Sequence, residues 1–85
     1  MLSPEVTPNI AAQVLYFFDG TRPPAREPGS FMYRLIDAIA HADQDNRRRI
    51  ALGFPAYVEA VEAVKFTTVG LDRIKVRAGE PDPEE

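Results

Sequence analysis

Apolar residues recur at intervals of three and four along most of the chain, which is the spacing of one face of an α-helix. The first such segment predicts a helix over residues 8–18. Thr7 offers a hydroxyl N-cap, and Pro8 suits the first helical position, where no N–H donor is needed. Asp19 and Gly20 end the segment, because glycine readily takes the conformation of a helix C-terminus. The apolar positions on this face are Ile10, Val14, Phe17 and Phe18.

The strongest periodic pattern predicts a second helix over residues 31–42, with Ser30 as its N-cap. Its apolar stripe is broad, so neighbouring positions flank the main face. The main face consists of Phe31, Leu35, Ala38, Ile39 and Ala42, and Met32, Ile36 and Ala40 widen it.

A polar stretch at residues 43–46 interrupts this pattern with short side chains that compete for backbone hydrogen bonds. Either the second helix continues through it, or a turn starts a new helix with Asp45 as its N-cap. The short polar side chains favour the turn, which places a third helix over residues 46–52. Three arginines would then lie at the helix start, where cations oppose the macrodipole.

Two further helices are predicted over residues 55–65 and 70–78. Pro55 suits the first position of the former, and residues 67–70 break the pattern before the latter. The apolar side chains on their faces are Tyr57, Val58, Val61, Val64, Leu71, Ile74 and Ala78.

Two segments are rich in proline and do not fit a helix. Residues 19–29 hold three prolines and predict an extended connector that packs over the surface. Residues 79–85 predict a disordered acidic tail. The chain therefore predicts a single helical domain over residues 1–78, of the all-α class, built as a compact bundle of four to five short helices. Residues 1–7 are expected to be an irregular lead-in.

The helical faces together predict the hydrophobic core. Ten apolar positions point to the interior if each stripe faces its neighbours. They are Ile10, Val14, Phe18, Phe31, Leu35, Ile39, Ile50, Phe54, Val58 and Val61.

Charge and composition narrow the function classes. The 85 residues carry a net charge of −3 but no cysteine, which leaves no thiolate nucleophile or metal cluster. Four of the thirteen acids lie in the tail, so the helical part is close to neutral and lacks the basic excess of a typical nucleic-acid binder. Neither a secretion signal nor the ~20 apolar residues of a membrane helix occurs, so a cytoplasmic protein is expected.

Candidate chemistry is sparse. His41 is the single histidine, with Asp37 at helical spacing, but no serine or cysteine lies nearby to serve as a nucleophile. Asp43 and Asp45 add carboxylates, yet they fall in the predicted turn and lack the pattern of a calcium loop. The sequence therefore predicts a protein that is not an enzyme and has no metal or cofactor.

Two features remain as candidate partner-binding residues. Consecutive arginines could meet an anionic partner, either an acidic protein surface or nucleic acid, or could pair locally. Aromatic side chains that do not fit the core could anchor a protein contact. The candidates are Arg47, Arg48, Arg49, Tyr16 and Tyr33.

Residues 29–61 carry a distinctive run of motifs. The run includes Gly29-Ser30-Phe31, Ala42-Asp43, Asn46-Arg47 and Phe54-Pro55-Ala56-Tyr57-Val58. It resembles small helical proteins of unassigned function from Gram-positive and actinobacterial genomes and their phages. The resemblance implies a phage or mobile-element setting rather than a mechanism.

The function expected from the sequence is that of a small non-enzymatic accessory protein that contacts a host or regulatory protein. The alternative is a nucleic-acid-binding regulator that uses the three arginines, although the third helix is short for a helix that reads DNA. A homodimer is also consistent with so small a domain, because its own core supplies limited stability.

Overall fold

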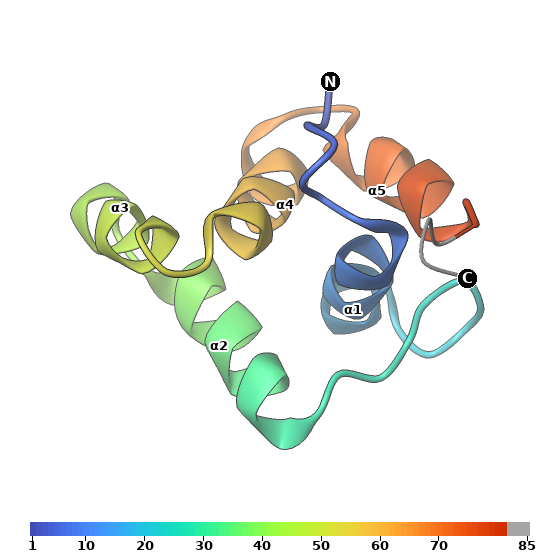
Figure 1. Ribbon diagram of the computed structural model, residues 1–85, viewed down its shortest axis with the longest axis horizontal. Coiled ribbons are helices and arrows are strands. Elements are labelled where there is room, and N and C mark those ends of the chain that lie inside the picture. Colours follow the sequence, from blue (N-terminus) through green and yellow to red (C-terminus); the bar gives the residue numbers. More distant parts are fainter. Residues whose placement is uncertain (82–85) are drawn as a thin grey trace.

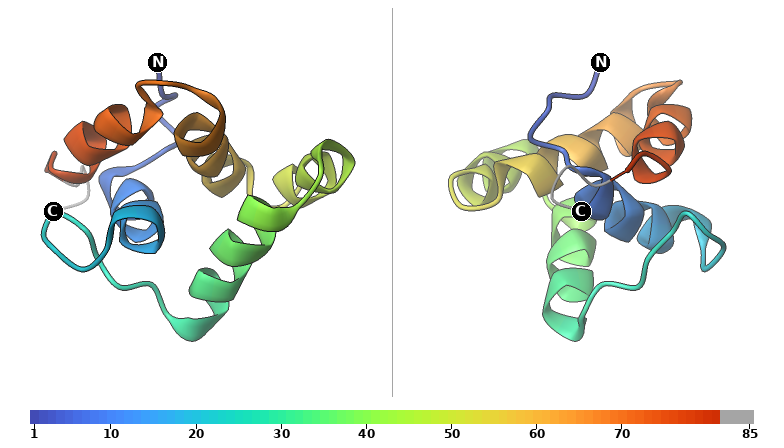
Figure 2. Two further views of the ribbon diagram at one scale, coloured as in Figure 1. Left: turned by 180° about the vertical axis from the view of Figure 1, so that it is seen from behind. Right: turned by 45° about the vertical axis from the view of Figure 1, so that its right-hand side comes forward.

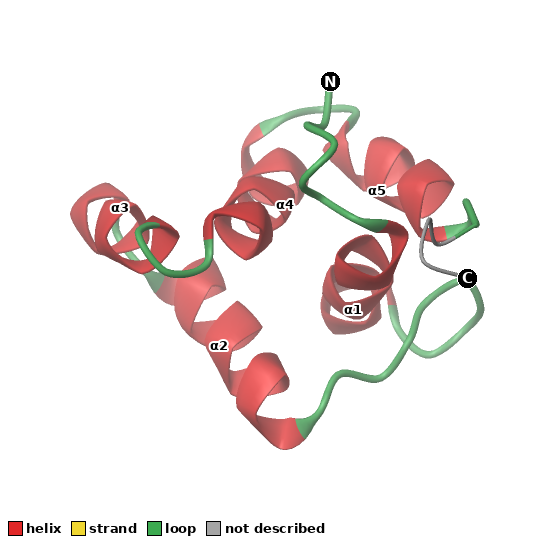
Figure 3. Cartoon of the chain, viewed as in Figure 1, coloured by secondary structure: helices red, strands yellow, loops and turns green. Residues whose placement is uncertain are grey.

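The computed structural model describes residues 1–81, and these form five α-helices without a strand (Figures 1 and 3). The all-α compact fold predicted from the sequence is confirmed. No helix among the described residues is both long and apolar enough to cross a membrane. The predicted disordered tail falls partly outside the description, since residues 82–85 are not described. The helices are α1 (Pro8–Asp19), α2 (Ser30–His41), α3 (Gln44–Ala51), α4 (Pro55–Phe66) and α5 (Gly70–Ala78).

The helix boundaries agree with the sequence pattern for α1, α4 and α5. Thr7 caps α1, because its hydroxyl oxygen accepts a hydrogen bond from the Ile10 N–H at 3.2 Å. Gly20 follows α1 with a φ of 97°, and its N–H donates to the Tyr16 carbonyl at 3.2 Å. This positive φ is the conformation for which glycine was expected there.

The predicted N-caps of α2 and α3 are wrong. Ser30 is the first residue of α2, and Gly29 takes the N-cap position without a side-chain hydrogen bond. Asp43, not Asp45, caps α3: its carboxylate accepts the Asn46 N–H at 2.8 Å. The helix therefore starts two residues earlier than predicted. Arg48 and Arg49 lie in its last turn, where cations favour the helix dipole instead of opposing it.

The core lies where α1, α2, α4 and α5 meet. Val14, Ile39, Val58 and Val61 are buried as predicted. The other confirmed positions are only partly buried at its edge: Ile10, Phe18, Leu35 and Ile50. Phe54, also predicted to be in the core, is half-buried outside this cluster, and its ring makes tilted and edge-to-face contacts with those of Phe31 and Tyr57. The buried residues that the prediction missed are Leu2, Val6, Ala11, Ala12, Leu15, Ile36, Ala40, Ala60 and Ile74.

Phe31 was predicted to be in the core and is 63% exposed. The inward face of α2 is formed by Ile36, Ile39 and Ala40. The sequence placed Ile39 on the main face, but it placed Ile36 and Ala40 at the margin of the stripe. α2 begins away from α4 and α5, at the bottom of Figure 1, so its first turn has few neighbours to cover it. Phe31 contacts the ring of Phe54 there, with centroids 6.3 Å apart.

The N-terminal segment is part of the core rather than a free lead-in. Leu2 and Val6 are buried, and the guanidinium of Arg77 donates hydrogen bonds to the carbonyls of Ser3 and Val6 at 3.0 and 2.5 Å. Ser3 in turn donates from its N–H and its hydroxyl to the Glu59 carboxylate, each at 2.6 Å. Residues 1–7 thus join α4 to α5.

The proline-rich connector packs over α1, as expected. The Arg26 N–H donates to the Ala12 carbonyl at 3.0 Å, and Pro28 is buried. At the other end of the molecule, α3 contacts α2 and α4 but neither α1 nor α5 (Figure 2). The connector and α3 therefore lie at opposite ends of α2.

Candidate partner-binding surface

Tyr16 and Tyr33, which are distant in sequence, line the same groove. Tyr16 comes from the second half of α1 and Tyr33 from the first turns of α2, and the end of the connector closes the third side. The groove has a volume of about 380 Å³. Its lining residues are Tyr16, Glu27, Pro28, Ser30, Tyr33 and Arg34.

Aromatic rings pack in edge-to-face and tilted contacts that include Tyr33. The ring of Phe17 lies 5.3 Å from that of Tyr33 and 5.1 Å from that of Phe18, measured between centroids. Both separations are typical of favourable aromatic pairs. Tyr33 nevertheless stays 43% exposed, so a rigidly supported aromatic surface faces solvent.

Charged side chains at the groove have both signs. Arg34 and Glu27 line it directly. Arg26, next to it on the connector, donates to the Asn9 side-chain carbonyl at 2.9 Å. Within residues 1–81, Arg34 makes no ion pair, so its charge is available to a partner. The groove thus combines aromatic surface with one free cation and one carboxylate.

Arg47 does not lie on a free surface. Its side chain is only 14% exposed, and its Nε donates to Glu62 Oε2 at 2.8 Å. A second nitrogen donates to the Ala42 carbonyl at 2.8 Å, and the guanidinium lies 4.6 Å from the ring centroid of Phe66. These contacts join α3 to α4 and to the end of α2. The residue therefore has a structural role, which is one of the alternatives left open by the sequence.

Arg48 and Arg49 are exposed on α3. Arg48 lies 3.6 Å from the Asp45 carboxylate, and Arg49 donates to the side chain of Asn46 at 3.4 Å. Both contacts are long, and pairs at the surface are worth only ~0–1 kcal/mol. These two arginines are therefore accessible, but Asp45 lies on the same short helix and Asp43 caps its start.

The structure does not bring the arginines and the tyrosines together. α2 has 12 residues and is about 18 Å long, and the tyrosine groove lies at its start while α3 follows its end (Figure 1). The five candidate residues thus form two separate sites rather than one.

The remaining polar side chains of residues 1–81 that we describe make local contacts or join two helices. His41 Nδ1 lies 2.8 Å from the Asp37 carbonyl and 3.1 Å from its carboxylate, on an exposed helix end. In the described part of the chain, no three or more histidine, cysteine or acidic side chains gather as metal ligands would. Burial raises the pKa of Tyr57, whose hydroxyl donates to Gln13 at 2.8 Å and links α4 to α1.

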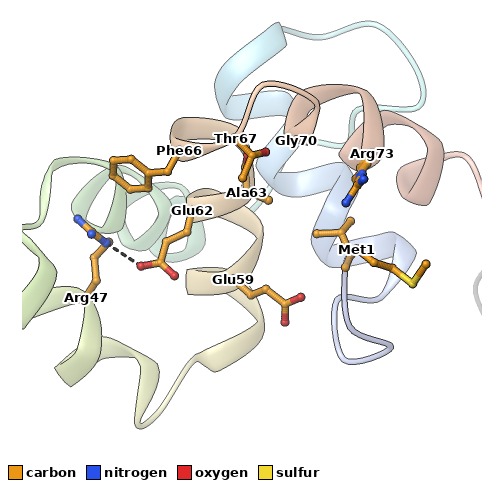
Figure 4. Close-up of a pocket in the computed structure, with 10 residues that line it drawn as sticks. Met1, Arg47, Glu59, Glu62, Ala63, Phe66, Thr67, Gly70 and Arg73 are labelled. Carbon is orange, nitrogen blue, oxygen red and sulfur yellow. Dashed lines mark hydrogen bonds and ion pairs between the residues drawn. The ribbon is translucent and has the colours of Figure 1, made fainter.

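The structure also shows a surface that the sequence interpretation missed. Met1, Phe66, Val69 and Val76 are exposed around the junction of α4 and α5. They line two adjoining grooves, the first of which is drawn in Figure 4. Val76 lies on α5 and Val69 immediately precedes the helix, seven residues earlier, so the two are expected on the same side of it. That spacing could have revealed the face, since the inward Ile74 lies elsewhere on the helix.

Comparison of this chain with protein-family models, with curated proteins and with solved structures found no match. The resemblance of residues 29–61 to small actinobacterial and phage proteins therefore stays a prediction.

Proposed function

We propose that this chain is a small non-enzymatic accessory protein that binds a protein partner through the groove between α1 and α2. The observation that carries the proposal is the pair Tyr16 and Tyr33, which line one groove although 17 positions separate them. Tyrosine is enriched at protein interfaces because it offers a large contact area with few rotatable bonds. The ring of Phe17 beneath Tyr33 holds this area in place before a partner arrives.

The setting of this function is also part of the proposal. A phage or mobile-element origin, a host or regulatory partner and a cytoplasmic location follow from the resemblance and from the composition of the chain. A partner that occupies the groove would meet Arg34 and Glu27 at its edges, which would orient it.

The alternative is a nucleic-acid-binding regulator, which the exposure of Arg48 and Arg49 favours. Arg47 would take no part, because Glu62 and the Phe66 ring already occupy it. Two cations on an eight-residue helix that also carries Asp45 supply little attraction for phosphates. Protein contact is therefore the better-supported function.

Two double variants separate the functions. Tyr16→Ala/Tyr33→Ala removes the aromatic groove, and Arg48→Gln/Arg49→Gln removes the accessible cations without touching it. Each is immobilised beside the wild type and exposed to a bacterial lysate, with and without nuclease. We expect a protein that the wild type and the arginine variant retain, that nuclease does not release, and that the tyrosine variant loses.

Circular dichroism of each variant checks that the helices remain. If the captured protein is lost after nuclease or with the arginine variant, the alternative function is the right one. If the tyrosine variant retains every protein that the wild type captures, the groove is not the binding site.

A further inference from the structure

The tyrosine groove is rich in hydrogen-bond donors that the described part of the chain does not use. Five of its six lining residues have polar side chains, and none of the five makes a side-chain hydrogen bond or an ion pair with another residue of 1–81. Two phenol hydroxyls, one serine hydroxyl and one guanidinium can donate, whereas an ionised glutamate only accepts. A ligand that presents several acceptors and few donors therefore matches this groove. The five residues are Tyr16, Glu27, Ser30, Tyr33 and Arg34.

The groove is small and bounded on three sides. Tyr16 on α1 and Tyr33 on α2 form two of its walls, and the end of the connector forms the third. An α-helix is ~10–12 Å wide, so a single turn of it takes up more than the groove's volume of about 380 Å³. One turn of polyproline II is narrower and spans three residues over ~9 Å. The dimensions of the groove therefore favour an extended ligand over a helix.

Proline-rich segments supply the acceptors that this groove matches. Each proline keeps its carbonyl but has no N–H, so a run of prolines presents acceptors and no backbone donors. Polyproline II forms no internal hydrogen bonds, which leaves these carbonyls free to accept from a partner. Its apolar rings pack in grooves lined by aromatic side chains. The wall of this groove already contains a buried proline, Pro28.

Two opposite charges in the groove determine which residues should flank the prolines. Glu27 on the connector and Arg34 on α2 are both exposed. A ligand with one basic and one acidic residue beside its prolines can pair with both charges. A segment with charges of a single sign would be repelled by one of them. The order of the two charges along the ligand then sets the direction in which it binds.

We propose that the tyrosine groove binds an extended, proline-rich segment of a protein partner, in which one basic and one acidic residue flank the prolines. This inference rests on the proposed function, which assigns the groove to a protein partner, and it specifies the chemistry of the segment. The tyrosine hydroxyls donate to proline carbonyls, while Glu27 pairs with the basic residue and Arg34 with the acidic one. Little freedom is lost on binding, because Phe17 packs against Tyr33 and polyproline II is preformed.

Two synthetic peptides of opposite order test the proposal. One consists of arginine, four prolines and aspartate, the other of the same residues in reverse, and both have blocked termini. Chemical-shift titration of the isotope-labelled full chain with up to about 5 mM peptide measures Kd, because this range detects even millimolar affinity. We expect one order to bind at least about fivefold more tightly, with shifts centred on residues 16, 27, 33 and 34. A control peptide with the charges of the tighter one but glycine and serine instead of proline should bind at least about fivefold more weakly.

Variants of the protein test the individual contacts. Glu27→Lys/Arg34→Glu exchanges the two charges and should reverse which peptide order binds more tightly. Tyr16→Phe/Tyr33→Phe keeps the rings but removes the hydroxyl donors, so it should bind several-fold more weakly. Tyr57→Phe is the matched control: its hydroxyl already donates to Gln13 and does not line the groove, so binding should stay within about twofold of the wild type.

Three results would overturn this inference: no detectable binding of either proline peptide, equal affinity for the proline and the glycine–serine peptides, or an unchanged preference in Glu27→Lys/Arg34→Glu. The proposed function is tested separately, by whether Tyr16→Ala/Tyr33→Ala loses the lysate protein. If that protein is lost but the proline peptides do not bind, this inference is wrong and the proposed function stands. If the peptides bind as expected but the lysate protein is retained, the proposed function is wrong and the preference of the groove for proline-rich segments stands.

Discussion

α1 and α3 are held in the molecule by different kinds of contact. α1 buries four apolar residues and packs against α5 more extensively than any other pair of helices does. α3 buries none. Ile50 and Ala51 are only partly buried at the edge of the core. Polar contacts add to them: the Asp43 cap at the start of α3, and the guanidinium of Arg47 between Glu62 and the Ala42 carbonyl. An element with only a small apolar face can thus be well placed, provided that its charged groups find partners.

This difference between α1 and α3 predicts which substitutions destabilise the domain. Contacts between α1, α4, α5 and the N-terminal segment form a continuous buried interface, so changes there should destabilise the whole domain. Changes on α3 and at the start of α2 should be small unless they remove a partner of Arg47.

Gly70→Ala should be the most damaging single substitution. Gly70 is buried at the start of α5, and an added methyl group would overlap the carbonyl group of Ala63 at the end of α4. Because the obstacle is backbone, α5 would have to move away from α4. We expect a loss of about 3 kcal/mol or more, enough to unfold much of so small a domain. Thermal and urea denaturation followed by circular dichroism measure it.

Gly53→Ala is the matched control in the turn between α3 and α4. The new methyl group would meet only the Ile50 carbonyl oxygen, at 4.0 Å, which is ordinary contact. Its stability should stay within about 0.5 kcal/mol of the wild type. If the two variants melt alike, the close approach of α5 to α4 is not what the fold depends on.

Leu15→Ala and Phe31→Ala compare a core position that the sequence missed with an exposed one that it predicted to be buried. Leu15 is 2% exposed, so its truncation should cost about 2–5 kcal/mol. Phe31 contacts chiefly the ring of Phe54, and its loss should cost about 1 kcal/mol or less. Urea midpoints at constant slope give both values. A larger loss of stability for Phe31→Ala than for Leu15→Ala would mean that Phe31 belongs to the core, as the sequence predicted.

The helices could be predicted because their signals are local. Proline at the first position of α1 and α4, the Thr7 cap and the apolar period each act within a few residues. The rotation of α2 about its own axis could not be predicted, because its apolar stripe is so wide that either edge of the stripe could face the core. Only the positions of α1 and α4 select Ile36 over Phe31. The burial of Leu2 and Val6 likewise depends on Arg77, more than 70 residues away.

The candidate site could be predicted only in part, because the sequence identifies candidate residues but does not show which of them the fold brings together. Tyr16 could be singled out because three consecutive aromatics cannot all face inward, but only the fold brings it beside Tyr33. The run of three arginines looked like one feature. Successive helical positions diverge by ~100°, so Arg47 turns toward α4 while Arg48 and Arg49 face solvent.

Arg77→Gln tests the hydrogen bonds that hold the N-terminal segment to α5. The guanidinium supplies hydrogen bonds to backbone carbonyls of residues 2, 3 and 6, and glutamine is too short to replace them. We expect a loss of about 2–3 kcal/mol, because hydrogen bonds from a charged donor are worth ~1.5–3 kcal/mol. Hydrogen exchange should show the N-terminal segment opening before α1.

Replacing Arg47 or Arg48 of α3 by glutamine compares a largely buried arginine with an exposed one. Arg47→Gln should cost about 1–2 kcal/mol, because Glu62 and the Ala42 carbonyl lose a largely buried partner. Arg48→Gln should cost about 0.5 kcal/mol or less, since its pair with Asp45 is long and exposed. Equal losses in these two variants would mean that α3 is not fixed by Arg47.

Tyr57→Phe should have a small effect at neutral pH and a distinct effect in alkali. The Tyr57 hydroxyl donates to Gln13 across the contact between α4 and α1, so its removal should cost about 0.5–1.5 kcal/mol.

Burial raises the pKa of Tyr57, so the folded protein keeps this proton at a pH where the unfolded chain, with a pKa of about 10, has lost it. The folded state then binds more protons than the unfolded state, and stability falls as pH rises above about 10. Tyr57→Phe should remove this part of the alkaline loss, so the stabilities of the two proteins converge as the pH rises above about 10. Tyr33→Phe, at an exposed ring, controls for the loss of a phenolic oxygen and should change neutral-pH stability by less than about 0.5 kcal/mol. An alkaline loss of stability as steep in Tyr57→Phe as in the wild type would show that the α1–α4 contact does not hold this proton.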